Sequence, residues 1–185
     1  KLKTIPYKFK NLKSLIISFN DFNYRFSSFE ERFGKLPKEI FKIKTLEELD
    51  INLNGLKDIP KEISALKNLK ILDAHENEIG CISGFVLELT NLKELILNNN
   101  KIEKIPYRID RLINLEKLNL SCNKIKDLPD TICNLKNLKE LKCDENIIKE
   151  IPEDIWKLAS LEILDLSYNA IEYIPKSIGK LKNLK

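Results

Sequence analysis

The chain has 185 residues, of which 43% are hydrophobic, and a formal net charge of +4. This proportion of apolar residues is ordinary and supports a real hydrophobic core in one domain or in an array of small units. No run of 18 apolar residues occurs, so we expect no integral membrane span.

A first strand pattern lies at residues 12–22. Leu12, Leu15 and Ile17 stand eight, five and three residues before Asn20. Leu15 and Ile17 should therefore point to the same side of a strand that Asn20 ends. Residues 1–11 hold the back half of an earlier copy of this pattern. They contain no signal peptide and no initiating Met, so we interpret the sequence as part of a longer chain.

An insertion close to residues 23–33 separates this strand from the segment that follows it. Its phenylalanines are spaced like one stripe of a helix. They are Phe22, Phe26, Phe29 and Phe33. Ser28-x-x-Glu31 matches a helix capping box. We predict a short added helix that either shields the N-terminal end of the core or binds a partner.

From residue 46 the pattern recurs every 23 residues without gaps. The regular repeats are 46–68, 69–91, 92–114, 115–137, 138–160 and 161–183, after a repeat with the insertion at 12–45, and residues 184–185 start another. In each repeat, the amide of the strand-ending Asn can bond peptide groups that no sheet ladder reaches. A Pro and apolar residues three apart then predict a short helical or 3₁₀ return segment.

The phrase Leu-x-x-Leu-x-Leu-x-x-Asn-x-Ile of residues 115–125 is similar to the leucine-rich repeat. The phrase at 128–138, Leu-Pro-x-x-Ile-x-x-Leu-x-Asn-Leu, resembles the intracellular Ras-group class, with its Shoc2-like scaffolds and plant relatives. Leu36-Pro37-Lys-Glu-Ile40 is also similar to a phrase of leptospiral leucine-rich repeat proteins. The resemblance implies an α/β fold over residues 1–185: one right-handed solenoid, with a parallel sheet on its concave side and short helical or 3₁₀ segments on its convex side.

Residues suited to catalysis or metal binding are scarce. The single His and the scattered Ser form no nucleophile–base relay, and the five Gly form no phosphate-binding loop. The four cysteines form no C-x-x-C pair, and His75 is the only histidine. We therefore expect no metal site, no cofactor and no enzymatic activity.

The cysteines also bear on the compartment. Cys143 stands where other repeats have Leu, so we expect a buried thiol there. The disulfide-bonded caps usual in extracellular leucine-rich repeats are not visible, which favours reduced thiols and a cytoplasmic protein. The leptospiral resemblance implies the alternative of a secreted or cell-surface protein.

Acidic residues gather at the positions six, four, two and one before each Asn, which should line the concave sheet surface. Our candidate partner-binding residues there are Glu48, Asp50, Leu53, Asp73, His75, Glu76, Ile96, Asn98, Asn119, Lys142, Asp144, Glu145, Asp165 and Tyr168. An acidic surface with isolated apolar residues suits a protein partner with a basic patch. The other interpretation is an ordinary solvated face.

Lysines gather instead at the turn that leads into each strand. They are Lys10, Lys13, Lys44, Lys67, Lys70, Lys93, Lys136, Lys139, Lys182 and Lys185. They predict a basic edge that either is simply solvated or contacts an anionic membrane or polyanion. Interleaved aromatic residues and Arg are lacking there, so we expect no nucleic-acid partner.

We predict a monomeric protein–protein interaction scaffold that uses the acidic concave face. The Ras-group resemblance implies a small GTPase, a phosphatase or a kinase as partner. The alternatives are a membrane- or polyanion-associated module that uses the lysine-rich edge, and a regulatory segment of a larger signalling enzyme.

Overall fold

A computed structural model describes residue 9, residues 11–18 and residues 36–185 of the chain. The helix that we predict at 23–33, with its phenylalanine stripe, lies outside the described residues.

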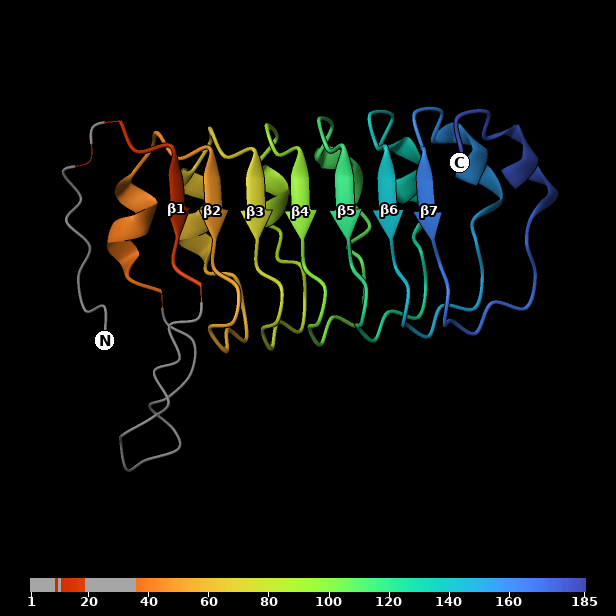
Figure 1. The fold of residues 1–185 in the computed structure, drawn as a ribbon, viewed down its shortest axis with the longest axis horizontal. Coiled ribbons are helices and arrows are strands. Elements are labelled where there is room, and N and C mark those ends of the chain that lie inside the picture. Colours follow the sequence, from red (N-terminus) through yellow and green to blue (C-terminus); the bar gives the residue numbers. More distant parts are fainter. Residues whose placement is uncertain (1–8, 10, 19–35) are drawn as a thin grey trace, which may run out of the picture.

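Within that part of the chain, seven short parallel strands form one sheet in sequence order (Figure 1). They are β1 (Ser14–Ile16), β2 (Glu48–Asp50), β3 (Ile71–Asp73), β4 (Glu94–Ile96), β5 (Lys117–Asn119), β6 (Glu140–Lys142) and β7 (Ile163–Asp165). The register from β2 onward joins residues that are one repeat apart, so that Leu49 lies beside Leu72 and Leu72 beside Leu95. Equivalent residues of successive repeats therefore form straight rows across the sheet.

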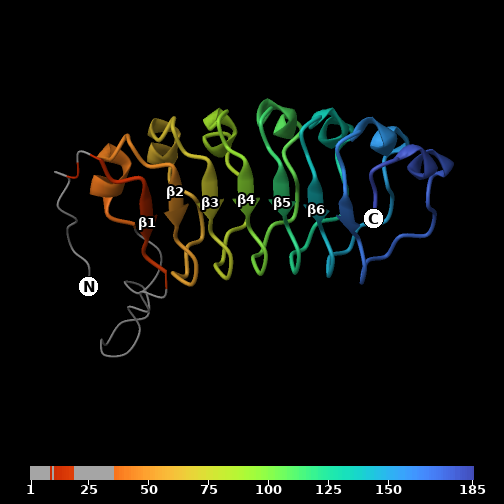
Figure 2. The ribbon, with the colours of Figure 1, turned by 45° about the horizontal axis from the view of Figure 1, so that its top comes forward.

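Short 3₁₀ turns form a second layer against one side of the sheet (Figures 1 and 2). They are η2 (Lys38–Lys42), η3 (Lys61–Ala65), η4 (Val86–Glu88), η5 (Ile109–Arg111), η6 (Asp130–Asn134), η7 (Glu153–Lys157) and η8 (Lys176–Lys180). A proline directly precedes most of them, as Pro60 precedes η3 and Pro129 precedes η6. The predicted solenoid, with a parallel sheet on one side and short helical segments on the other, is confirmed.

The hydrophobic core fills the space between these two layers. The central strand residues Leu49, Leu72, Leu95, Leu118 and Leu141 are fully buried. Cys143 is also fully buried, as its place in the repeat predicts. No single coil has enough apolar surface to form a core alone. The rows of leucines that run through successive coils therefore form one shared core.

The strand-ending asparagines join neighbouring coils, as predicted. The Asn100 side chain accepts a hydrogen bond from the Ile79 N–H at 2.9 Å. Its amide donates at 3.0 Å to the carbonyl oxygen of Leu97 in its own coil and to that of Ala74 in the preceding coil. Asn77, Asn123, Asn146 and Asn169 make equivalent bonds. Each asparagine therefore satisfies backbone groups from two coils.

A second row of polar side chains, which our sequence analysis did not single out, joins the coils at the opposite turn. Asn91 donates to the Lys67 carbonyl oxygen at 2.8 Å, and Asn114 donates to that of Thr90 at the same distance. Asn68, Asn137 and Asn183 do the same. The 23-residue recurrence of Asn in the Leu-x-Asn-Leu phrase was the available signal.

Replacing Asn100 with Ala should lower the free energy of unfolding by about 3 kcal/mol, because each buried peptide group left unpaired costs about 1–3 kcal/mol. Urea unfolding monitored by circular dichroism measures this change. Asn98→Ala is the matched control, since the Asn98 side chain makes no hydrogen bond within the described chain, and it should change stability by less than about 0.5 kcal/mol. Equal losses in the two variants would contradict the structural role of Asn100.

Candidate functional site

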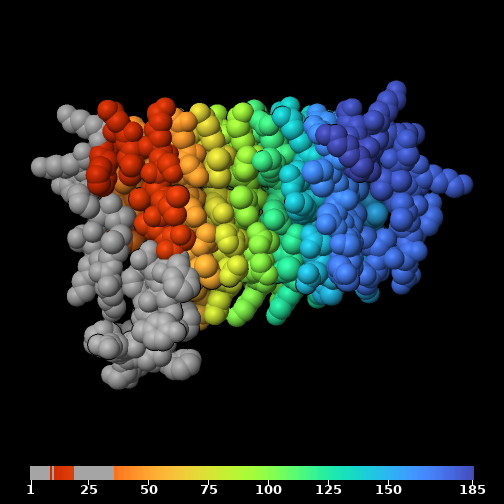
Figure 3. Space-filling view, in the orientation of Figure 1, coloured from red at the N-terminus to blue at the C-terminus, as the bar shows by residue number. Residues whose placement is uncertain are grey.

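The outward side of the sheet, which we call the strand face, carries the candidate residues in parallel rows. One row contains Ser14, Glu48, Ile71, Glu94, Lys117, Glu140 and Ile163, and the next contains Ile16, Asp50, Asp73, Ile96, Asn119, Lys142 and Asp165. All of these side chains are at least partly exposed. In space-filling view the coils form narrow stripes across this face, so a partner laid across the stripes would contact several repeats (Figure 3).

Two further rows, formed by the residues two and one before each strand-ending Asn, continue the strand face beyond the strand ends. The residue directly before each strand-ending Asn has a positive φ, from 49° at Glu76 to 55° at Asn99. Its N–H donates to a carbonyl oxygen of the next coil, as Glu76 does to Asn98 at 3.0 Å. The left-handed conformation costs a non-glycine residue roughly 1–2 kcal/mol. Intercoil hydrogen bonds of this kind support it in the turns from Leu53 to Glu145.

Four acids and the only histidine form the N-terminal acidic cluster. It consists of Glu48, Asp50, Asp73, His75 and Glu76. Burial raises the pKa of Asp50, opposed by a hydrogen bond from the Asn52 N–H, and the negative charges of Asp73 and Glu48 raise it further. His75 Nδ1 lies 2.6 Å from Asp73 Oδ1, and His75 Nε2 lies 3.9 Å from Glu76 Oε1. This cluster therefore presents more negative charge than the neighbouring histidine can offset.

Three acids form the C-terminal acidic cluster, which consists of Asp144, Glu145 and Asp165. The side chain and N–H of Ser167 donate to Asp165 at 2.7 and 3.0 Å and lower the pKa of its carboxyl. Asp144 accepts a hydrogen bond from the Ser121 hydroxyl. Two apolar side chains lie nearby: Ile163 is 42% exposed and Tyr168 is 82% exposed. The cluster thus combines negative charge with accessible apolar surface.

The strip between the two clusters carries little net charge. Lys117 pairs with Glu94 at 3.2 Å, and Lys142 pairs with Glu140 at 2.7 Å. Ile96, Asn98, Asn99 and Asn119 complete the strip, which lies mainly over β4 and β5. From the sequence we expected one acidic surface, and the roles of Glu94, Lys117 and Glu140 were missed. The opposite charges of Glu94 and Lys117, one repeat apart, were the available signal.

The predicted basic edge is a mixed row of charges instead. Glu47 pairs with Lys13 at 2.9 Å and with Lys70 at 2.6 Å. A second glutamate, Glu116, pairs with Lys93 and Lys139, and Glu162 pairs with Lys185. These lysines hold the pKa of both Glu47 and Glu116 at about 2. A groove of about 590 Å³ runs beside this row, lined by Lys13, Thr45, Glu47, Asn68, Lys70, Asn91, Lys93 and Asn114. Its lysines have carboxylate partners, which weakens the edge as a site for polyanions.

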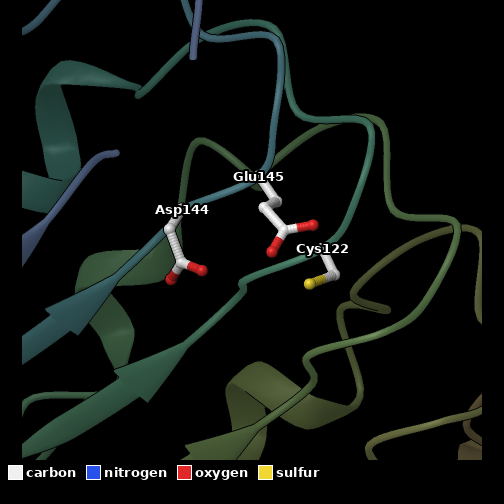
Figure 4. Close-up of side chains that lie close together, drawn as sticks. All are labelled: Cys122, Asp144 and Glu145. Carbon is white, nitrogen blue, oxygen red and sulfur yellow. The ribbon is translucent and has the colours of Figure 1, made fainter. Parts of the chain in front are cut away.

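One group of possible metal ligands lies on the strand face, at Cys122, Asp144 and Glu145 (Figure 4). One ligand atom of each residue lies within 4.8 Å of the others. Burial and the negative charge of Glu145 raise the pKa of the Cys122 thiol, which therefore stays protonated at neutral pH. We assign no metal to this group. Sequence spacing could not reveal it, because the three residues come from adjacent coils.

Among the described residues, no helix is long and apolar enough to cross a membrane.

Two family profiles match overlapping parts of the chain. A profile described as "Leucine rich repeat" matches residues 113–171. One described as "Leucine Rich repeats (2 copies)" matches residues 67–108 and 90–131. A search of curated proteins found no match.

Solved structures share the fold over most of the chain. The ectodomain of the Arabidopsis thaliana receptor kinase GASSHO1/SCHENGEN3 is 28% identical, with a TM-score of 0.69 over 98% of this chain and 25% of its own. The plant peptide hormone receptor RGFR1 is 30% identical, with a TM-score of 0.74 over 82% of this chain and 25% of its own. An internalin of Listeria monocytogenes is 23% identical, with a TM-score of 0.80 over 97% of this chain and 48% of its own. The chain thus spans about a quarter to a half of these proteins.

Replacing Glu116 with Gln should lower the free energy of unfolding at pH 7 by less than about 1 kcal/mol, as is usual for exposed ion pairs. The pKa of Glu116 is lowered from 4.5 to about 2, so its stabilising effect is complete above pH 4.5 and is lost as the pH falls towards 2. Urea unfolding at pH 7, 4 and 2 should show the difference between the two proteins disappearing at the lowest pH. Glu103→Gln, at an exposed acid that has no ion pair among the described residues, is the control and should change the free energy of unfolding at pH 7 by less than about 0.5 kcal/mol.

Replacing Asp50 with Asn should stabilise the protein at pH 7 by roughly 0.5 kcal/mol, because burial and like charges disfavour the ionised carboxyl. The raised pKa of Asp50 means that wild type regains this difference as the pH falls through that pKa. Asp165→Asn is the matched control. The pKa of Asp165 is lowered, so its substitution should destabilise the protein under the same conditions. Thermal unfolding of both variants at pH 7 tests the opposite signs.

Proposed function

Because the chain is a leucine-rich repeat protein, we propose that it is an interaction scaffold whose strand face binds a protein partner with basic side chains. The observation that carries this proposal is the alignment of Asp50 with Asp73 in one exposed row, with Asp165 further along it. Leucine-rich repeat domains commonly mediate protein–protein interactions, and repeat solenoids offer extended surfaces for them.

Charge complementarity favours a basic partner. The whole chain carries +4, yet the two clusters on the strand face hold seven carboxylates, at Glu48, Asp50, Asp73, Glu76, Asp144, Glu145 and Asp165. No lysine or arginine pairs with these acids among the described residues, whereas the acids of the edge row have lysine partners. Acids without a lysine or arginine partner attract basic partners and speed their association.

Two structural relatives were solved as complexes, which supports a binding role for this fold. The GASSHO1/SCHENGEN3 ectodomain was solved in complex with CASPARIAN STRIP INTEGRITY FACTOR 2, and the receptor RGFR1 in complex with RGF2. Leucine-rich repeat domains of this kind are typically binding modules without catalytic activity. The partner of this chain is therefore proposed to be bound and not chemically changed.

The finer features of the proposal follow the Ras-group resemblance. We propose a monomeric cytoplasmic scaffold whose partner is a small GTPase, a phosphatase or a kinase. The four cysteines are all unpaired, and two of them, Cys133 and Cys143, are buried, which suits a reducing compartment.

The test replaces Asp50, Asp73 and Asp165 with Asn together and compares the variant with wild type in quantitative pull-downs with the intact gene product. Asn keeps an oxygen that can accept the N–H bonds that Asn52, His75 and Ser167 make to these positions. The variant should therefore fold, and it should recover the partners of the wild-type protein at least about tenfold less well, since three charged contacts are removed.

A control variant removes the same number of charges outside the strand face, at Asp58, Glu103 and Asp127. These exposed acids follow the strand-ending asparagines and have no ion pair in the described chain. The control should bind like wild type. Unchanged recovery by the strand-face variant would refute the proposal, provided that circular dichroism shows both variants folded.

A further inference from the structure

We infer that the strand face binds an extended segment of the partner in which two basic side chains stand about six residues apart, one against each acidic cluster. This inference rests on the proposed function and specifies the form of the bound partner.

The first observation is the separation of the two clusters. Asp73 in β3 and Asp165 in β7 lie in the same row of the sheet, four strands apart. Neighbouring strands are about 4.8 Å apart, so the two carboxylates are separated by about 19 Å along the row. One basic side chain cannot contact both clusters, whereas two side chains at this separation can.

The second observation is the neutral strip that lies between the clusters. Within the described chain, the side-chain amides of Asn98 and Asn99 make no hydrogen bond, and the Asn119 side chain donates none and accepts two, from the N–H and the hydroxyl of Ser121. All three amides are free to donate to an extended backbone, and those of Asn98 and Asn99 are also free to accept from it, because the N–H and C=O groups of such a backbone are unpaired. A helix has its backbone groups paired internally and binds by an apolar face, for which this strip offers only Ile96.

The expected spacing follows from chain geometry. An extended chain advances about 3.3 Å per residue, so about 19 Å corresponds to about six residues. The rise of an α-helix is about 1.5 Å per residue, so the same span would need about 13 residues. The sequence separation of the two basic residues therefore distinguishes an extended segment from a helix.

Three synthetic peptides of equal length and composition test the inference. Each carries two Arg in an uncharged polar background, separated by three, six or 13 residues. Fluorescence anisotropy with the full chain at low salt measures their affinities. The peptide with a separation of six should bind at least about fivefold more tightly than the other two, which is the size expected of one additional partly exposed charge pair.

Single variants then show whether both clusters are used. Asp73→Asn and Asp165→Asn should each lower the affinity for the peptide with a separation of six by about fivefold and abolish its advantage over the other two peptides. Asp58→Asn, outside the strand face, should leave all three affinities unchanged. Tightest binding at a separation of 13 would overturn the inference in favour of a helix.

Equal affinities at all three separations would also overturn it. If Asp73→Asn and Asp165→Asn still lowered the affinity for every peptide, the acidic strand face would remain the binding surface. Only the inference that the bound segment is extended would then be wrong. Affinities that neither variant changes would refute the inference together with the proposed function.

Discussion

The hydrogen bonds of the strand-ending asparagines hold each coil of this molecule against the next. An asparagine such as Asn100 bonds carbonyl groups of its own coil and of the preceding one, and so fixes their separation and their relative shift. Because every coil is fixed in the same way, equivalent side chains form straight rows on the strand face. The alignment of Asp50 with Asp73, on which the proposed function rests, is a direct consequence of this register.

The same register determines a backbone feature that the sequence does not reveal. Positive φ occurs directly before the strand-ending asparagines from Asn54 to Asn169, and none of these residues is a glycine: Leu53, Glu76, Asn99, Cys122, Glu145 and Tyr168. A left-handed turn usually shows itself through Gly, because other residues are strained there. From Leu53 to Glu145, the N–H of the turn residue donates to a carbonyl group of the next coil, and this repeated bond offsets the local strain.

Much of the fold could be predicted from the sequence, because a 23-residue period places Leu and Asn at equivalent points of every coil. Leu118 and Asn123 have the roles that their spacing predicts. The electrostatics could be predicted only in part. Whether a charge is neutralised depends on the residue one coil away, and Lys117 lies beside Glu94 although 23 positions separate them. The division of the strand face into two clusters follows from such pairs, as does the mixed edge row.

The stability of the fold does not account for Asp50 in the N-terminal acidic cluster. Side chains stacked in register at about 4.8 Å feel their neighbours strongly, and like charges at that distance repel. Burial is the first cause of the raised pKa of Asp50, and the negative charges of Asp73 and Glu48 add to it. Where the chain stacks Glu94 against Lys117, or Glu47 against Lys70, the repulsion is replaced by an ion pair. At Asp50 the ionised carboxyl therefore disfavours the isolated protein slightly, and a cation supplied by the proposed partner would remove that cost, so the charge of this residue is better explained by binding than by folding.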